Sequence, residues 1–250
     1  MSPVLETRRL CKSFGALTVA DNIDFRLEPG SRHALIGPNG AGKTTFVTML
    51  TGALAPTSGR IFLDGQEVTR TSQAARVKLG LGRTFQITSL FRSLPVLDNV
   101  ALSVAERRGV ATRLWRPASA HTEVLDEARG LLEALGLADD AATAAQDLPY
   151  GKQRLLEIAV TLGLKPRVLL LDEPAAGVPS HDSQRILEQL ARLPGDIAIL
   201  IIEHDMDLVF RFAQRITVLV QGQVLVEGTP SEIAADKRVR DVYLGEATHG

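Results

Sequence analysis

The sequence predicts an α/β fold in which a mainly parallel sheet is flanked by helices, with an antiparallel β subdomain at the N-terminus and an inserted α-helical subdomain. Three observations support this prediction. Strand-like runs separated by turn residues predominate in residues 4–69, and strands alternate with helices from residue 168 onward. Between them, from about 87 to 165, apolar residues recur at the three- and four-residue spacing of helices.

The antiparallel part begins with strands and ends with a hairpin. Glu28-Pro29-Gly30 closes its second strand, and Asp64-Gly65 is a strong two-residue hairpin signal. The expected elements are, in order, strands at 4–10, 22–27 and 33–36, a helix around 46–50, and strands at 60–63 and 66–69.

The helical insert and the last third follow from the same patterns. Gln221-Gly222 predicts a second hairpin, and Thr229-Pro230-Ser231 marks the start of a short helical tail over 231–250. The expected elements are helices at 97–107, 123–135 and 152–162, then a strand at 168–171, a helix at 183–193, a strand at 197–202, a helix at 208–212, strands at 216–220 and 223–227, and a helical segment at 231–244. We expect one domain over 1–250, interrupted by the insert at about 87–165.

Composition excludes several classes of protein. The chain is 45% hydrophobic and 23% charged, as soluble proteins are, and its longest apolar runs fall far short of the ~20 residues of a membrane span. The N-terminus lacks the pattern of a secretory signal, and a single cysteine, Cys11, suits a reducing cytosol. A net charge of -1 argues against nucleic acid as a partner. Residues 83–116 are rich in arginine and 123–147 in acids, which indicates either solvated faces or a basic part facing a membrane or a membrane partner.

A phosphate-binding loop lies between the third strand and the first helix. Its eight residues fit G-x-x-x-x-G-K-[ST] in full: Gly37, Pro38, Asn39, Gly40, Ala41, Gly42, Lys43 and Thr44. Backbone N–H groups at a helix N-terminus present many donors to a triphosphate, and glycine permits the close approach. Lys43 would reach the β- and γ-phosphates, and the Thr44 hydroxyl is placed for Mg²⁺. The pattern favours a P-loop nucleotide-binding core over an ordinary glycine turn.

A second polar group follows the apolar strand at 168–171. Asp172 and Glu173 stand at its carboxyl end, where α/β sheets bind ligands. Asp172 can hold Mg²⁺ through water, and Glu173 can polarise a water in line with the γ-phosphate as general base. Two further polar residues, Gln86 and His204, also follow strands. An amide can ligate Mg²⁺ or position water, and an imidazole can hydrogen-bond the γ-phosphate, although each taken alone is more often structural.

In order and spacing, these motifs resemble those of the ATP-binding cassette (ABC) ATPases over essentially the whole chain. The shared segments are 37–45, Gln86, 148–153, 171–174 and 202–205. Finer residues, at 82–86, 155–159, 173–177, 202–206 and 243–247, look like the LivG-type branch, the bacterial branched-chain amino acid transport ATPases. The sequence has these segments and lacks an Asn-Lys-x-Asp motif for reading guanine, which argues against a GTPase or a small-molecule kinase.

The resemblance implies a role for each matching position. Phe14 would stack on adenine, although the sequence favours equally a phenylalanine that packs in the core near a strand end. Thr45 extends the ATP-binding loop, Gln86 would link the Mg²⁺ site to the helical insert that touches the transmembrane partner, and His204 would be the switch histidine. Two such cassettes sandwich two ATP molecules, and each ATP touches a signature segment of the opposite chain. Here that segment is Leu148, Pro149, Tyr150, Gly151, Lys152 and Gln153.

Two departures from the family pattern concern residues that act across the dimer. The usual Leu-Ser-Gly-Gly-Gln becomes Leu-Pro-Tyr-Gly-Lys, so Pro149 brings neither hydroxyl nor N–H and Tyr150 replaces a glycine. Lys152 could compensate with its charge. Pro179 stands where the family's D-loop has Asp or Asn. A homodimer would carry the weak signature twice, so a heterodimer with asymmetric sites is favoured.

The resemblance implies an ATP-hydrolysing subunit of an importer that uses ATP and Mg²⁺. Its expected partners are a second ABC ATPase, transmembrane permease subunits and a periplasmic or extracellular solute-binding protein, at the cytoplasmic face of the bacterial inner membrane. The cargo implied is branched-chain or related hydrophobic amino acids. The alternative is a soluble ABC ATPase in DNA repair or translation, which would usually carry coiled-coil insertions or a second cassette.

Overall fold

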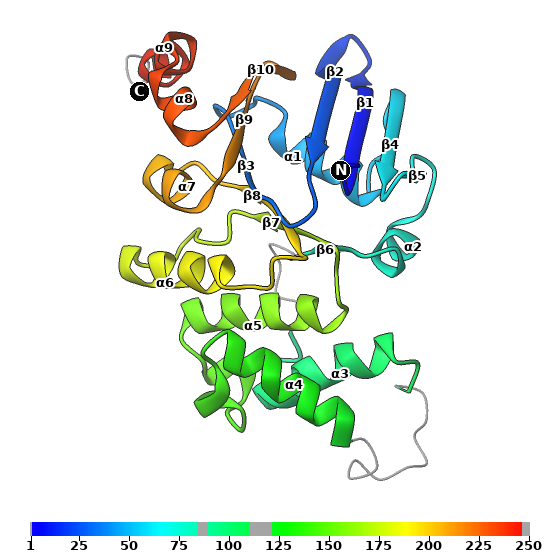
Figure 1. The fold of residues 1–250 in the computed structure, drawn as a ribbon, viewed down its shortest axis with the longest axis vertical. Helices are drawn as coiled ribbons and strands as arrows, with labels where there is room; N and C mark the ends of the chain where they lie inside the picture. Colours follow the sequence, from blue (N-terminus) through cyan, green and yellow to red (C-terminus); the bar gives the residue numbers. More distant parts are fainter. Residues whose placement is uncertain (1, 85–89, 111–121, 247–250) are drawn as a thin grey trace. The chain divides into compact units, whose positions relative to one another are not determined.

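The structure is a computed structural model that describes residues 2–84, 90–110 and 122–246 (Figure 1). The chain forms two compact units. The first comprises Met1–Leu81, Arg167–Glu173 and Pro194–Gly250, and the second comprises Gly82–Pro166 and Pro174–Leu193. Within the described ranges, no helix is both long and apolar enough to cross a bilayer.

Two sheets are built mainly from the first unit. An antiparallel sheet has the order β2-β1-β4-β5, and a six-stranded sheet has the order β10-β9-β3-β8-β7-β6. In the second sheet β9, β3, β8 and β7 run parallel, and β10 pairs antiparallel with β9. The strands are β1 Leu5–Phe14, β2 Leu17–Leu27, β3 Arg32–Ile36, β4 Ser58–Leu63, β5 Gln66–Glu67, β6 Leu81–Arg83, β7 Val168–Asp172, β8 Ala198–Ile202, β9 Arg215–Val220 and β10 Gln223–Gly228. The predicted fold class is confirmed.

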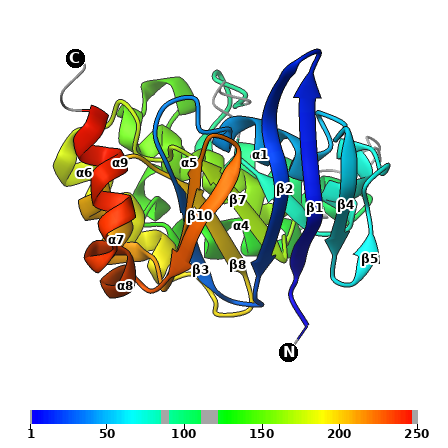
Figure 2. The ribbon, with the colours of Figure 1, turned by 90° about the horizontal axis from the view of Figure 1, so that it is seen from above.

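The core of the first unit gathers around helix α1, Lys43–Thr51. Buried α1 residues pack in one cluster with side chains from β1, β2, β3, β4, β7 and β8, so the helix joins the antiparallel and the parallel sheet. Phe25 of β2 meets Phe46 of α1 edge to face, with ring centroids 5.5 Å apart. The other helices of this unit are α2 Gln73–Lys78, α7 Met206–Phe212, α8 Pro230–Ala235 and α9 Lys237–Glu246. Figure 2 shows α8 and α9 beside β10, and α8 packs against β9 and β10.

A buried arginine fixes the end of α1. Arg76 of α2 is 1% exposed, and its guanidinium donates to the carbonyls of Met49, Leu50, Thr69 and Thr71. The last carbonyls of a helix lack partners within the helix, and a cation at this end interacts favourably with the negative end of the helix dipole. Burial lowers the pKa of Arg76. The sequence predicted neither α2 nor this contact.

A second buried polar network lies on the strand that leads into the phosphate loop. His33 of β3 is 1% exposed; its Nε2 is 2.8 Å from Thr217 Oγ1, and its ring meets Phe25 edge to face. The Thr217 hydroxyl donates to Glu227, which also pairs with Arg215. Because the hydroxyl proton goes to Glu227, His33 Nε2–H is the donor to Thr217.

The second unit is a group of helices with the apolar spacing predicted from the sequence. Helices α3, α4 and α5 contact one another (Figure 1), and their buried residues include Val100, Leu132 and Leu156. Gly163 allows the closest approach, because a Cβ there would lie 2.0 Å from Ser103 Oγ. The helices are α3 Val96–Arg107, α4 Thr122–Ala134, α5 Tyr150–Gly163 and α6 Ser180–Ala191, with 3₁₀ turns η2 Ala138–Asp140 and η3 Ala145–Asp147.

The two oppositely charged runs pair with each other where the structure describes them. Arg107 and Arg108 of the basic run both bond Glu127 of α4, and Arg108 also pairs with Glu123. These arginine side chains are 24% and 32% exposed. Attraction between α3 and α4 therefore accounts for this part of the charge pattern without a membrane.

Candidate nucleotide site

The phosphate loop connects β3, buried along its whole length, to α1. Gly42 occupies the N-cap of α1 with a left-handed φ of 98°, and Lys43 opens the helix. Gly37 and Ala41 are buried, Pro38, Gly42, Lys43 and Thr45 are half-buried, and Asn39, Gly40 and Thr44 are exposed. The strand, the left-handed turn and the helix start are the arrangement that presents backbone donors to phosphate.

Other segments of the first unit brace the loop. A Cβ at Gly37 would lie 2.0 Å from the carbonyl oxygen of Leu219, and one at Gly42 would lie 2.4 Å from that of Val19. Gly222, in the turn between β9 and β10, donates its N–H to the Ala41 carbonyl at 3.0 Å. The sequence predicted the Gln221-Gly222 turn, but no sequence signal linked it to a loop about 180 residues earlier.

The charged end of Lys43 lies inside the loop. Its Nζ donates to the carbonyl oxygens of Gly37 and, at 2.9 Å, Pro38. These bonds hold the ammonium group beside the backbone donors, where it adds a positive charge to the helix N-terminus. The arrangement can hold the phosphates of a nucleotide.

Asp172 and Glu173 lie at the carboxyl end of β7. Asp172 is 6% exposed and pairs in register with Ile202 of β8, which itself pairs with Leu35 of β3. Because parallel strands end at the same edge, this register brings the carboxylates and the start of the phosphate loop to one edge of the sheet.

Glu173 has an unusual backbone that turns it out of the strand. Its φ is 47°, in the left-handed region that non-glycine residues seldom adopt, and its N–H donates to the Ile202 carbonyl at 2.9 Å. Strain of this kind costs about 1–3 kcal/mol and clusters at functional sites. The bend separates the direction of Glu173 from that of Asp172, as a division of roles between adjacent carboxylates requires.

His204 follows β8 and faces acidic groups. Its Nδ1 lies 3.9 Å from Glu173 Oε1 and 3.8 Å from Glu203 Oε2, and its side chain is 68% exposed. Glu203 is 1% exposed and accepts the backbone N–H of His204 at 3.3 Å. No signal in the sequence indicated a role for Glu203, and only the structure shows this buried carboxylate beside His204.

Phe14 is exposed, so it is not part of the core. It ends β1 at 52% exposure, and Lys12 Nζ lies 4.9 Å from its ring centroid. An exposed ring can receive a flat ligand by stacking.

The signature-like segment lies in the second unit, at the start of α5. Leu148 is 5% exposed, Pro149 is the N-cap without a side-chain hydrogen bond, and Tyr150 is 45% exposed. Gln153 Nε2 donates to the Leu148 carbonyl at 2.9 Å. Proline at the N-cap leaves the first N–H groups of the helix without a side-chain acceptor from this position.

Lys152 of the signature-like segment forms an ion pair with Asp140. Its Nζ bonds both carboxylate oxygens of Asp140, at 2.9 and 2.7 Å, within the second unit. The charge that we expected to replace the lost hydroxyl is thus paired with an acid of the same unit. Nearby, Pro179 is the N-cap of α6, and its carbonyl accepts the N–H of Ser183.

Gln86 lies outside the described residues, so the structure does not place this predicted metal ligand. Among the described residues, no group of three or more His, Cys, Asp or Glu side chains could hold a metal. Mg²⁺ usually keeps several waters and is bound by one or two protein oxygens together with phosphates. The Thr44 hydroxyl and Asp172 carboxylate are suitable oxygen donors.

Comparison with known proteins agrees with this geometry. The ABC transporter family matches residues 20–176, and a second family, described as branched-chain amino acid ATP-binding cassette transporter, matches residues 223–249. Among solved structures, a nucleotide-free ATP-binding cassette from an ABC transporter superposes with a TM-score of 0.83 at 28% identity, covering 96% of this chain and 98% of that one. A structure of the ADP conformation of an ATP-binding cassette of an ABC transporter gives a TM-score of 0.86 at 28% identity, covering 98% of this chain and 100% of that one.

The chain thus belongs to the ABC transporter family, in which it is an ATP-binding ATPase. It is similar to the high-affinity branched-chain amino acid transport ATP-binding protein LivG of Escherichia coli K12, with 39% identity over 98% of this chain and 99% of that protein. BraF of Pseudomonas aeruginosa, with the same description, is 37% identical over 98% and 99%. A probable LivG of Archaeoglobus fulgidus is 32% identical over 97% and 95%.

Proposed function

We propose that this chain powers an importer of branched-chain or related hydrophobic amino acids. The observation that carries the proposal is the joint presence, at one edge of the parallel sheet, of the braced phosphate loop and the bent Glu173. The proposed cargo follows from the names of the similar LivG and BraF proteins. A soluble role in DNA repair or translation is not favoured, since the similar proteins are transport subunits over nearly their whole length.

Each site residue has a proposed task. The loop from Gly37 to Thr45 binds the phosphates, with Lys43 on the β- and γ-phosphates, and Phe14 stacks on adenine. Thr44, Asp172 and Gln86 hold Mg²⁺, which would supply a positive charge to the phosphate oxygens.

Glu173 accepts a proton from the attacking water as general base, and His204 orients the attack. The buried Glu203 carboxylate, 3.8 Å from His204 Nδ1, restrains the imidazole near Glu173. Glu173→Gln retains the shape but not the base, so it should hold ATP without turning it over.

The chain works as one cassette with a helical insert at about 87–165 and a short tail at 231–250. We expect permease subunits and a solute-binding protein as further partners, with the cassette at the cytoplasmic face of a bacterial inner membrane. The second ATPase is a different chain, because Pro149 lacks a hydroxyl and Lys152 is occupied by Asp140.

Reconstitution tests this function. The chain, a candidate second ATPase and the permeases from the same operon are placed in proteoliposomes, and uptake of labelled leucine is followed with the binding protein present. ATP-dependent uptake that Glu173→Gln abolishes is the expected result. Failure of the chain to associate with any permease would refute import.

The asymmetry of the two ATP sites has its own test. In the same proteoliposomes, Glu173→Gln in this chain is compared with the equivalent change in the second ATPase. This chain's Glu173 acts with the partner's intact signature, so its loss should reduce turnover more. Equal losses would exclude asymmetric sites.

A further inference from the structure

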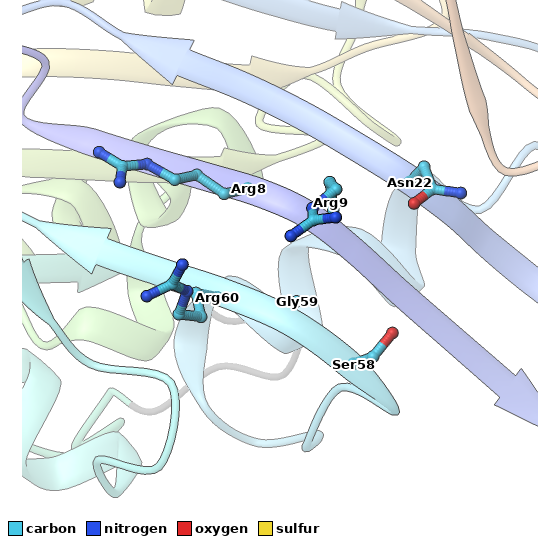
Figure 3. Close-up of a pocket in the computed structure, with 6 residues that line it drawn as sticks. All are labelled: Arg8, Arg9, Asn22, Ser58, Gly59 and Arg60. Carbon is cyan, nitrogen blue, oxygen red and sulfur yellow. The ribbon is translucent and has the colours of Figure 1, made fainter.

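A cavity of about 320 Å³ opens on the antiparallel sheet, away from the residues of the phosphate loop. Its lining comes from three neighbouring strands: Arg8 and Arg9 of β1, Asn22 of β2, and Ser58, Gly59 and Arg60 of β4 (Figure 3). A second cavity, of about 440 Å³, shares Arg8 and Arg9 and is also lined by Arg26 and by the acids Glu6, Asp24 and Glu227. Cavities of this size hold small molecules.

The backbone is irregular in all three strands where they line the cavity. Arg9, Asn22 and Gly59 have left-handed φ values of 46°, 50° and 87°. The register of β1 shifts between Thr7 and Leu10 against β2 and between Arg8 and Cys11 against β4, which defines a bulge at Arg9. A Cβ at Gly59 would lie 2.2 Å from the Arg9 carbonyl oxygen, so only glycine fits opposite this bulge.

The bulge gathers positive charge. Arg8 and Arg9 are both exposed although strand neighbours ordinarily point to opposite faces. Arg8 pairs in register with Arg60, which places two like charges directly across two strands, an arrangement that destabilises a sheet. The centroid of the Phe62 ring lies 4.4 Å from the Arg8 guanidinium and 5.8 Å from that of Arg60, so the ring makes cation–π contacts with both.

The acids near this charge lie on the side of the second cavity, where Asp24 Oδ1 accepts the Arg9 backbone N–H at 2.7 Å. Glu6 pairs with Arg8 at 2.8 Å and with Arg26 at 3.3 Å, while among the described residues neither Arg9 nor Arg60 forms an ion pair through its side chain. None of the acidic side chains in the described ranges lines the first cavity. The repulsion across β1 and β4 would be relieved by an anion between the arginines.

The polar lining selects the kind of anion. Guanidinium groups bind phosphate through paired N–H donors. Asn22 Nδ2 donates one N–H to Asp21 at 2.8 Å, so its second N–H and the hydroxyl of Ser58 can add hydrogen bonds to phosphate oxygens. None of the exposed large hydrophobic side chains of the described residues lines the cavity, so it lacks the anchors that a lipid-binding surface would use.

We propose that this cavity binds the phosphate groups of a small soluble polyanion, a polyphosphate or a phosphate ester, at a site separate from the ATP loop. Arg9 and Arg60 supply the charge, and Asn22 and Ser58 orient the phosphate. The inference does not depend on which solute is transported.

Calorimetric titration with pyrophosphate tests the proposal. The full-length chain carries Lys43→Ala in every sample to weaken binding at the phosphate loop, and no Mg²⁺ is added. The test variant adds Arg9→Gln and Arg60→Gln. The matched control adds Arg129→Gln and Arg192→Gln, two exposed arginines of the second unit, so that both proteins lose the same charge. Circular dichroism confirms folding of both.

Pyrophosphate should bind the Lys43→Ala chain and the control equally, and the test variant about tenfold or more weakly. Asn22→Gly, which keeps the left-handed backbone and removes the amide, should weaken binding less. Equal binding by test and control variants would overturn the site, as would no binding at all. Arginine-dependent binding to phosphatidylglycerol vesicles without pyrophosphate binding would also overturn the proposal, since the phosphate would then belong to a lipid.

Discussion

Acid should loosen the strand that carries the phosphate loop, because its buried histidine cannot readily accept a proton. Burial is the main cause that lowers the pKa of His33 from 6.5 to about 4; Arg215 lowers it further, and Glu227 opposes both. Protonation would add a second N–H, at Nδ1, and would place a charge beside the Phe25 ring. The perturbation that tests this is His33→Gln, whose amide can still donate to the Thr217 hydroxyl.

The sign and size follow from the two pKa values. The folded value lies below the unfolded one, so the unfolded chain binds the extra proton first and stability falls as the pH drops from 6.5 towards 4. One pKa unit corresponds to about 1.4 kcal/mol, so the full loss is about 3 kcal/mol, with about 2 kcal/mol reached by pH 5. Above pH 6.5 the contribution is constant.

Urea unfolding at pH 7.5 and pH 5.0, at one ionic strength, measures this difference. Other groups contribute the same background to every sample, so the quantity of interest is the free energy of unfolding of His33→Gln minus that of the wild type. It should rise by about 2 kcal/mol from pH 7.5 to pH 5.0. Gln66→Ala, at an exposed position without a titrating group, is the control and should follow the wild type. Parallel pH curves for His33→Gln and wild type would refute the reasoning.

Three further outcomes are expected. Glu173→Gln should lower the ATP hydrolysis rate about 10²–10⁴-fold with ATP affinity retained, and a variant with near-normal turnover would remove Glu173 from the general-base role. Gly37→Ala should abolish ATP binding in a fluorescent-nucleotide titration, because its Cβ would meet the Leu219 carbonyl at 2.0 Å; normal affinity would contradict the close approach. Arg76→Met should lower the free energy of unfolding by about 3 kcal/mol or more, because α1 loses the donor to its last carbonyls, and a loss below about 1 kcal/mol in urea unfolding would argue against that cap.

The phosphate loop and the carboxylate pair could be predicted because their chemistry is local. Gly42 and Lys43 must adjoin a helix start to present donors, and Asp172 must end an apolar strand, so the sequence alone fixes their setting. The order of these segments also indicated a parallel sheet. Features that depend only on neighbours along the chain were therefore accessible without a structure.

Long-range contacts could not be predicted in this way. The strands β1 and β2 extend well beyond the expected ranges because bulges at Arg9 and Asn22 absorb residues that break the alternating pattern. The tail forms two helices, since Asp236 ends α8 with an extended backbone. In the sequence Lys152 has no evident partner, whereas in the structure it pairs with Asp140, and no spacing rule connects those two residues.

The brace on the phosphate loop bears on how the protein is made. Gly222 and Leu219, which hold the loop from the far end of the chain, leave the ribosome about 180 residues after Gly42. At ~5–20 residues per second, translation separates them by roughly 10–40 s. During synthesis the glycine loop therefore spends that interval without its support, and a nascent chain shortened before residue 222 should not retain ATP. The chain therefore acquires the ability to bind nucleotide late in its synthesis, although the phosphate-loop motif is translated early.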